Sequence, residues 1–176
     1  MADKNKQEIQ PNFRVGSKLI KFGQVYRVFK FDKHQNIIHF SPYYKNKRTK
    51  TIICSIPLSS LEKARIRKPL SQKEIKKLLK FLSSDKDLKS TGSIIQAREK
   101  LSLNDPWETA NLLRFLWRDK KSLDINYTKS RQDLFKAAMR RLVEEVAFVQ
   151  HLAVKEARLK IKKSLNKIKV AKQKKD

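Results

Sequence analysis

The sequence predicts an α+β protein in which a small, strongly curved antiparallel β barrel precedes an all-helical domain of about five helices. Between Phe13 and Arg67, β-branched and aromatic residues are concentrated, as in short strands. After Pro69 the apolar residues recur three and four positions apart, which is the helical spacing. The stretch from Thr109 to Leu152 contains two such amphipathic patterns joined by a polar turn, so each needs another element to cover its apolar face.

Five short strands are expected within the about 55 residues from Phe13 to Arg67. Val25 to Phe31 has a strand-like composition, and Ile37–Phe40 and Thr51–Ile56 predict further strands. Ser41-Pro42 and the basic run from Tyr44 to Lys50 separate these strands as turn or loop. Such short strands must curve strongly to enclose a core, which favours a small barrel.

The helical domain opens with a defined start signal. Ser71 and Glu74 have the spacing of a capping box, in which each side chain accepts a hydrogen bond from the backbone amide of the other residue. A polar loop over 83–93 and a shorter helix over 94–102 are expected next. The first helix should turn four apolar residues inward, namely Ile75, Leu78, Leu79 and Leu82.

Two later start signals place the long helices. Asp105 followed by Pro106 predicts an N-cap and a first helical position, and Thr128 or Ser130 should cap a helix that begins near Lys129. A break is expected between His151 and Val154, although this stretch carries no glycine or proline. The last helix then uses Leu152, Ala157, Leu159, Ile161 and Leu165.

Two features of the long helices have simple structural interpretations. Trp117 lies on an apolar face, where a core role is the expectation. Glu144 and Glu145 follow Arg140 and Arg141, and we expect exposed helix salt links worth a few tenths of a kcal/mol each. With these assignments the chain divides into a disordered tail over 1–12, a barrel over 13–68, a helical domain over 69–166 and a basic tail over 167–176.

The charge of the chain indicates an anionic partner. Among 176 residues, 43 are basic and 17 acidic, which gives a formal net charge of +26 at neutral pH. Such a surface attracts polyanions, of which nucleic acid is the leading candidate. Solvated lysine faces are also common, so charge as mere background is the alternative. The hydrophobic share of 39% is enough for a packed core, which argues against disorder throughout the chain.

No catalytic or cofactor-binding pattern stands out. The three histidines are scattered, and three glycines are too few for a phosphate-cradling loop, so no catalytic residue, metal or cofactor is expected. Cys54 lies in an apolar run, where we expect a buried strand residue in a protein of the reducing cytoplasm. No apolar stretch approaches the roughly 18 residues of a membrane span, and the first ten residues lack the apolar core of a signal peptide.

Several short motifs occur in an order that resembles one family. Phe13-Arg14-Val15-Gly16-Ser17-Lys18 is similar to an opening F-x-V-G-D-x, and Leu61-Glu62-Lys63-Ala64-Arg65-Ile66-Arg67 to L-E-x-x-G-L-R. The other matches are Gly23, Ile56-Pro57, Arg98-Glu99-Lys100-Leu101, Arg114-Phe115-Leu116-Trp117-Arg118-Asp119 and Leu142-Val143-Glu144-Glu145-Val146-Ala147. From about residue 13 to about residue 165 the chain resembles the CarD/CdnL family of bacterial RNA-polymerase-binding transcription regulators.

The resemblance implies two binding surfaces. A Tudor-like barrel would bind the β subunit of RNA polymerase, with Lys33, Ile53 and Ser55 at the contact. The helical domain would contact double-stranded promoter DNA near the upstream edge of the transcription bubble. Its expected DNA-binding residues are Lys86, Lys89, Ser90, Arg98, Lys129 and Arg131. Such a protein would be a nucleoid-associated monomer in the cytoplasm.

At one position the chain departs from the pattern. Family members of the actinobacterial type carry a tryptophan that wedges into the minor groove, and that position falls on Ser90, with two arginine positions on Gly92 and Ser93. A serine cannot stabilise an unstacked base step as an apolar wedge does. Backbone contact through cations is therefore the expected binding mode. A general RNA-binding or ribosome-associated protein is the alternative function, although about 90 residues of helices with apolar faces favour the regulator.

Overall fold

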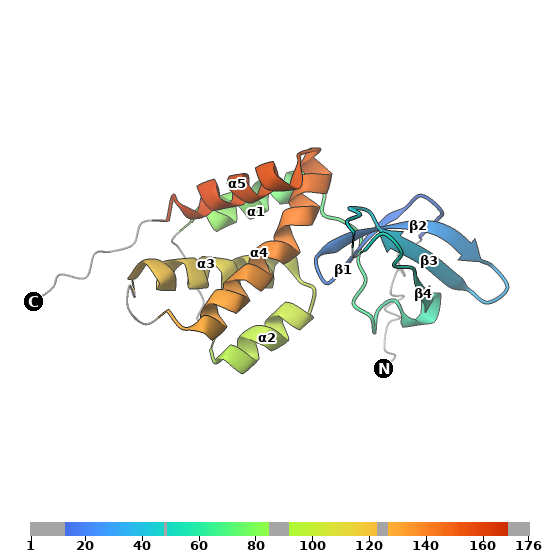
Figure 1. The fold of residues 1–176 in the computed structure, drawn as a ribbon, viewed down its shortest axis with the longest axis horizontal. Coiled ribbons are helices and arrows are strands. Elements are labelled where there is room, and N and C mark those ends of the chain that lie inside the picture. The colour runs from blue at the N-terminus through green and yellow to red at the C-terminus, as the bar shows by residue number, and fades with distance from the viewer. Residues whose placement is uncertain (1–12, 48, 85–91, 123–126, 169–176) are drawn as a thin grey trace, which may run out of the picture.

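The computed structural model describes residues 13–47, 49–84, 92–122 and 127–168, which form an antiparallel sheet followed by five α-helices (Figure 1). The strands are β1 (Lys18–Lys21), β2 (Gln24–Asp32), β3 (Ile37–Pro42) and β4 (Cys54–Pro57). The helices are α1 (Gln72–Leu82), α2 (Ile94–Ser102), α3 (Pro106–Ser122), α4 (Lys129–Gln150) and α5 (Val154–Leu165). The predicted α+β fold class, with its sheet before its helices, is confirmed. The tail over 1–12 and most of the tail over 167–176 lie outside the described residues.

The sheet is a half barrel in which the strands pair in chain order. Within the described residues it has four strands and not the expected five, because the fifth is reduced to a single bridge between Ile20 and Arg67. Cys54 lies on an outer strand and is only half-buried, contrary to the expectation of full burial. The core under the sheet consists of Phe13, Leu19, Tyr26, Val28, Ile38, Phe40, Leu61 and Ile66.

The helices enclose a second, separate core, and their start signals act as predicted. In the capping box the amide of Ser71 donates to Glu74 at 2.7 Å and the amide of Glu74 donates to Ser71 at 3.3 Å. Asp105 caps α3, and Thr128 caps α4. Between α4 and α5, His151 adopts a left-handed conformation, which produces the expected break. No helix in the described ranges has the length and apolar content needed to cross a membrane.

Asn104, in the turn between α2 and α3, ties this turn to the sheet. Its side chain accepts a hydrogen bond from the amide of Gly23 at 3.0 Å and donates to the carbonyls of Ile20 at 3.1 Å and Arg65 at 2.7 Å. Its backbone φ of 58° lies in the left-handed region, which asparagine tolerates better than most residues. One side chain thus satisfies three backbone groups that the junction removes from water.

Arg67 and Glu145 form a two-pronged ion pair beside Asn104. Two guanidinium nitrogens of Arg67 lie 2.6 and 2.7 Å from the two carboxylate oxygens of Glu145, whose side chain is 1% exposed. The same carboxylate accepts a hydrogen bond from the backbone amide of Leu70 at 2.8 Å. Arg67 also donates a hydrogen bond to the backbone carbonyl of Asn104 at 2.9 Å. The pair therefore joins the end of the sheet region to the C-terminal part of α4, with its hydrogen-bonding groups satisfied.

The expectation that Glu144 and Glu145 form exposed salt links within their helix is wrong. Glu145 is buried in the pair with Arg67. Glu144 is half-buried and accepts a hydrogen bond from the backbone amide of Val25 at 3.1 Å. Burial raises the pKa of Glu144, while the hydrogen bond from Val25 opposes this rise. Both carboxylates therefore connect α4 to the sheet region, and neither forms the exposed salt link expected within the helix.

Gly23 allows the β1–β2 hairpin to approach α4 closely. Its φ is +74°, and a Cβ built there would collide with the backbone of Arg141. The Arg141 guanidinium lies 5.4 Å from the ring centroid of Phe22 and donates to the carbonyl of Leu101 at 2.6 Å. The hairpin, α2 and α4 are thereby held together at one point.

We predict that replacing Arg67 by alanine lowers the free energy of unfolding by about 3 kcal/mol, because the Glu145 carboxylate then stays buried without its cation. Urea denaturation measures this loss. Lys129→Ala is the control, since it removes a pair between two exposed side chains and should cost no more than about 0.5 kcal/mol. Replacing both Arg67 and Glu145 by apolar residues should cost less than Arg67→Ala alone. Equal losses for Arg67→Ala and Lys129→Ala would contradict the anchoring role.

A second prediction separates backbone strain from close packing. Gly23→Ala should destabilise the fold clearly more than Gly16→Ala, although both glycines have a positive φ. At Gly16 nothing lies within 4 Å of the added Cβ, so only strain of about 1 to 2 kcal/mol is expected there. Thermal unfolding followed by circular dichroism compares the two variants. Equal midpoints would mean that α4 does not press on the hairpin.

Candidate nucleic-acid and protein interfaces

The outer edge of β4 is the candidate protein-binding surface. In the described residues β4 pairs only with β3, which leaves the backbone groups along its other edge without a strand partner. Ile53, directly before β4, is 66% exposed. Ser55 is also exposed, and its hydroxyl lies 2.7 Å from Nδ1 of His39 on β3. Because Ile53 and Ser55 are two positions apart in extended chain, their side chains lie on the same face.

Lys33 lies apart from these two residues. It begins the turn after β2, and the register pairs Asp32 with Ile37 and Ile37 with Pro57. Lys33 is therefore near the Pro57 end of β4, whereas Ile53 lies beyond the opposite end. Four residues of extended chain separate these ends by roughly 13 Å. The structure thus brings together two of the three expected contact residues and places the third at the far end of the strand.

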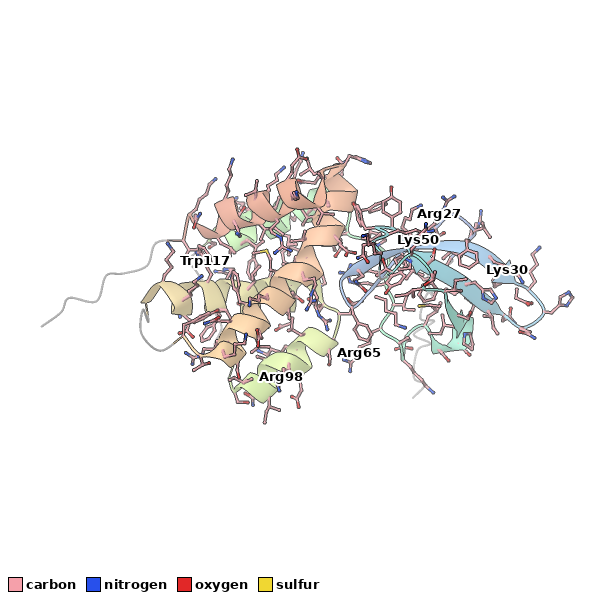
Figure 2. The ribbon with its side chains drawn as sticks, viewed as in Figure 1. Arg27, Lys30, Lys50, Arg65, Arg98 and Trp117 are labelled. Atoms are coloured by element: carbon pink, nitrogen blue, oxygen red, sulfur yellow. The ribbon has the colours of Figure 1, made fainter. Side chains whose placement is uncertain are left out.

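A basic and aromatic pocket next to this edge was not predicted. It has a volume of about 460 Å³, and Arg27, Phe29, Tyr43 and Lys50 are among the residues that line it. Phe29 is 43% exposed and lies at an irregularity in the pairing of β2 with β3, on the same outward face as Arg27. Figure 2 labels Arg27 of β2 and Lys50 of the turn before β4, which line this pocket together. The basic run over 44–50 was the only sequence signal of this pocket, and its partners depend on the strand register.

The candidate DNA-binding cations of the helical part differ in how they are engaged. Arg98 is exposed on α2 and forms no salt bridge within the part of the chain that the structure describes. The side chain of Lys129 is 79% exposed and lies 3.8 Å from Asp133. Arg131 instead binds Asp119 at 2.8 Å, and Asp119 is only 14% exposed. Arg98 and Lys129 can therefore reach a ligand, while Arg131 links α4 to the end of α3.

Lys86, Lys89 and Ser90 lie outside the described residues, in the segment that precedes α2. The start of α2 itself lies against α4, because Ser93 and Arg131 line one small pocket together. Ser93, at one of the family's arginine positions, caps α2 through reciprocal hydrogen bonds with Gln96. This end of α2 therefore shares one surface with the start of α4.

Both tryptophans have packing partners. Trp107, at the start of α3, meets Phe81 edge to face, with 5.8 Å between ring centroids. Trp117 stacks on Phe135 at 5.8 Å and is half-buried. Both rings are partly buried in these contacts, and the packing role expected for Trp117 is consistent with its contact.

In the described residues, no group of three or more His, Cys, Asp or Glu side chains could hold a metal ion. No protein-family model matches the chain, and a comparison with curated proteins finds no match. Function must therefore be inferred from the fold, the two surfaces and the motif order.

Proposed function

We propose that this protein is a transcription regulator of the CarD/CdnL type, without enzymatic activity. Its sheet would bind the β subunit of RNA polymerase, and its helical part would bind promoter DNA near the upstream edge of the transcription bubble and so modulate the stability of the open complex. The observation that carries this proposal is the open edge of β4, with exposed Ile53, joined through a packed polar junction to a separate cationic helical surface.

The β4 edge supports strand addition as the mode of polymerase binding. A partner strand can pair with the unoccupied backbone groups, and main-chain hydrogen bonds tolerate changes of side chain. Ser55 supplies no charge at this contact, so the apolar Ile53 would be the anchor. The short length of β4, from Cys54 to Pro57, limits unspecific pairing between copies of the protein.

The helical surface supports DNA binding through phosphates. Arg98 and Lys129 are exposed cations on α2 and at the start of α4, and the whole chain carries a formal charge of +26. Contacts of this kind position a protein on a duplex without reading its sequence. Arg131 would contribute less, because Asp119 already offsets its charge. With serine at the wedge position, we propose backbone binding without insertion of a side chain between bases.

The junction supports a bridging role. Arg67, Glu145 and Asn104 hold the sheet against α2 and α4, so the two surfaces keep one relative placement. A protein that must contact polymerase and upstream DNA together loses less entropy on binding when its two surfaces are already fixed.

A general RNA-binding role is the second candidate, and one observation favours it. Phe29 and Tyr43 are about as exposed as each other, at 43% and 44%, and lie in one pocket with Arg27, Lys45 and Lys50. Aromatic rings among cations can stack unpaired bases and hold their phosphates. Affinity purification from native cells separates the two roles. Recovery of polymerase subunits supports the regulator, and recovery of ribosomal proteins supports the RNA-binding role.

We predict that duplex DNA binding weakens with salt, with a slope near −3 to −4 in log affinity against log salt concentration for about three to five phosphate contacts. Arg98→Ala with Lys129→Ala should reduce the magnitude of this slope by about two, equally for different sequences. Fluorescence anisotropy across a salt series measures it. The matched control is Lys30→Ala with Lys63→Ala, which removes two exposed cations from the sheet region. If both double variants change the slope equally, DNA binding is not localised on the helical surface.

We further predict that Ile53→Asp weakens binding of the polymerase β subunit about tenfold or more, because a buried charge would replace an apolar anchor. Ile95→Asp is the matched control, since Ile95 on α2 is 68% exposed and Ile53 is 66% exposed. Biolayer interferometry with the purified β subunit, in the absence of DNA, compares the full-length variants. Loss of binding in Ile95→Asp alone would place the polymerase contact on the helices.

A further inference from the structure

A pocket among α3, α4 and α5 has a composition that the proposed function does not use. Its volume is about 350 Å³, and side chains from the end of α3 and from α4 and α5 line it. Figure 2 shows Trp117 of α3 in the half of the helical part that lies away from the sheet, and Trp117 stacks on the pocket residue Phe135. The pocket is thus distinct from the β4 edge and from the basic pocket on the sheet.

Four cations from three helices converge on this pocket. They are Lys120 of α3, Lys136 of α4, and Arg158 and Lys162 of α5, which lie one helical turn apart and so face the same side. No carboxylate is among the lining residues. In the described part of the chain only Lys136 of these four forms a salt bridge, with Asp133 at 3.9 Å, and both of these side chains are more than half exposed. Asp119, which precedes Lys120, is paired with Arg131 at 2.8 Å. The pocket therefore has a positive potential that local carboxylates do little to offset.

The floor of the pocket is apolar and rigid. Phe135 and Met139 lie one turn apart on α4, and Met139 is 1% exposed. The ring of Phe135 is held by Trp117, with 5.8 Å between centroids and an angle of 24° between the planes. The partly buried ring of Phe135 offers a flat apolar surface to a planar heterocycle.

Tyr127 at the rim adds a neutral polar group. Its hydroxyl donates to the carbonyl of Arg131 at 3.3 Å. Burial raises the pKa of Tyr127 to about 12, with a further contribution from Asp119 and an opposing one from Arg131. The phenol stays protonated at neutral pH, so it does not reduce the positive potential of the pocket.

We infer that this pocket binds a nucleotide with two or more phosphate groups. Arg158 and Lys162 would hold the phosphates, with Lys120 and Lys136 on the other side, and the base would lie against Phe135 and Met139. A guanidinium matches phosphate oxygens with paired hydrogen bonds, and lysines add point charges. The volume lies within the range of small-molecule pockets, roughly 300 to 1,000 Å³.

A free nucleotide fits these features better than the backbone of a duplex. In a duplex the bases are paired and stacked, so the apolar floor formed by Phe135 and Met139 would remain uncovered. A single strand offers an unpaired base together with phosphates, and it is therefore the competing source of the same chemistry. The pocket walls from three helices favour the smaller ligand.

The test is isothermal titration calorimetry of the full-length protein with ATP, with GTP and with inorganic triphosphate at about 0.15 M salt, where distant surface charges are screened. Arg158→Ala with Lys162→Ala should weaken ATP and GTP binding about tenfold or more. Lys160→Ala with Lys163→Ala removes the same charge from exposed positions of α5 that do not line the pocket, and it should leave binding unchanged. Circular dichroism melting of both variants checks that α5 remains folded.

Four outcomes would overturn the inference. No heat change with any nucleotide at millimolar concentration excludes the site, and equal weakening in both double variants means general attraction to a basic helix. Triphosphate that binds as tightly as ATP removes the role assigned to Phe135 and Met139. A short single-stranded DNA that binds through Arg158 and Lys162 when free nucleotides do not would assign the pocket to a nucleic-acid strand. The inference is supported if ATP and GTP bind the unchanged protein and only the variant with Arg158→Ala and Lys162→Ala loses this binding.

Discussion

The ion pair between Arg67 and Glu145 is the interaction on which the arrangement of this protein depends. Burying a carboxylate is costly unless a cation and hydrogen bonds compensate for the lost water. Here the guanidinium binds both carboxylate oxygens, and the amide of Leu70 adds a third hydrogen bond. Neither side chain has an equivalent partner if the sheet moves away from α4. The pair therefore specifies one docking geometry, and Asn104 completes it by satisfying backbone groups of the hairpin and its neighbours.

The junction holds the two separate hydrophobic cores in one relative placement. The cores under the sheet and between the helices are separate clusters, as two small domains would have. Ile20 and Val25, opposite each other in register, are fully buried but belong to neither cluster. A polar, oriented interface with a small apolar contact joins the parts, and this combination favours fixed geometry over a loose linker. The proposed bridging function needs such a fixed geometry, because its two partners are themselves held together on promoter DNA.

Nearby acidic residues determine which cations of this basic chain are available to bind an anionic ligand. Asp119 holds Arg131 in the link between α3 and α4, so this arginine has a structural partner. Arg98 is exposed on α2, and the cations around the pocket of α3, α4 and α5 have few carboxylates near them. A net charge of +26 predicts attraction to polyanions in general. The placement of 17 acidic residues determines where on the surface this attraction remains.

The helices could be predicted from the amino-acid sequence, because the interactions that start and stop them are local. The capping box at Ser71, the caps at Asp105 and Thr128, and the change of spacing after Pro69 predicted the helices, because each involves residues within one turn. Among the candidate site residues, the family resemblance pointed to Ile53 and Arg98, which are exposed in the structure, although nothing in the sequence separated Arg98 from the ion-paired Arg131.

Features that depend on residues far apart in the chain could not be predicted in this way. Arg67 and Glu145 are 78 positions apart, so periodicity gave them no connection, and the helical pattern favoured a salt link within α4 instead. Within the described residues, the reduction of the fifth strand to a single bridge, the irregularity between Val28 and Lys30, and the convergence of Lys120, Lys136 and Arg158 likewise arise from packing between elements. The physical reason is that hydrogen bonds and charges pair by distance in space, and the fold sets that distance.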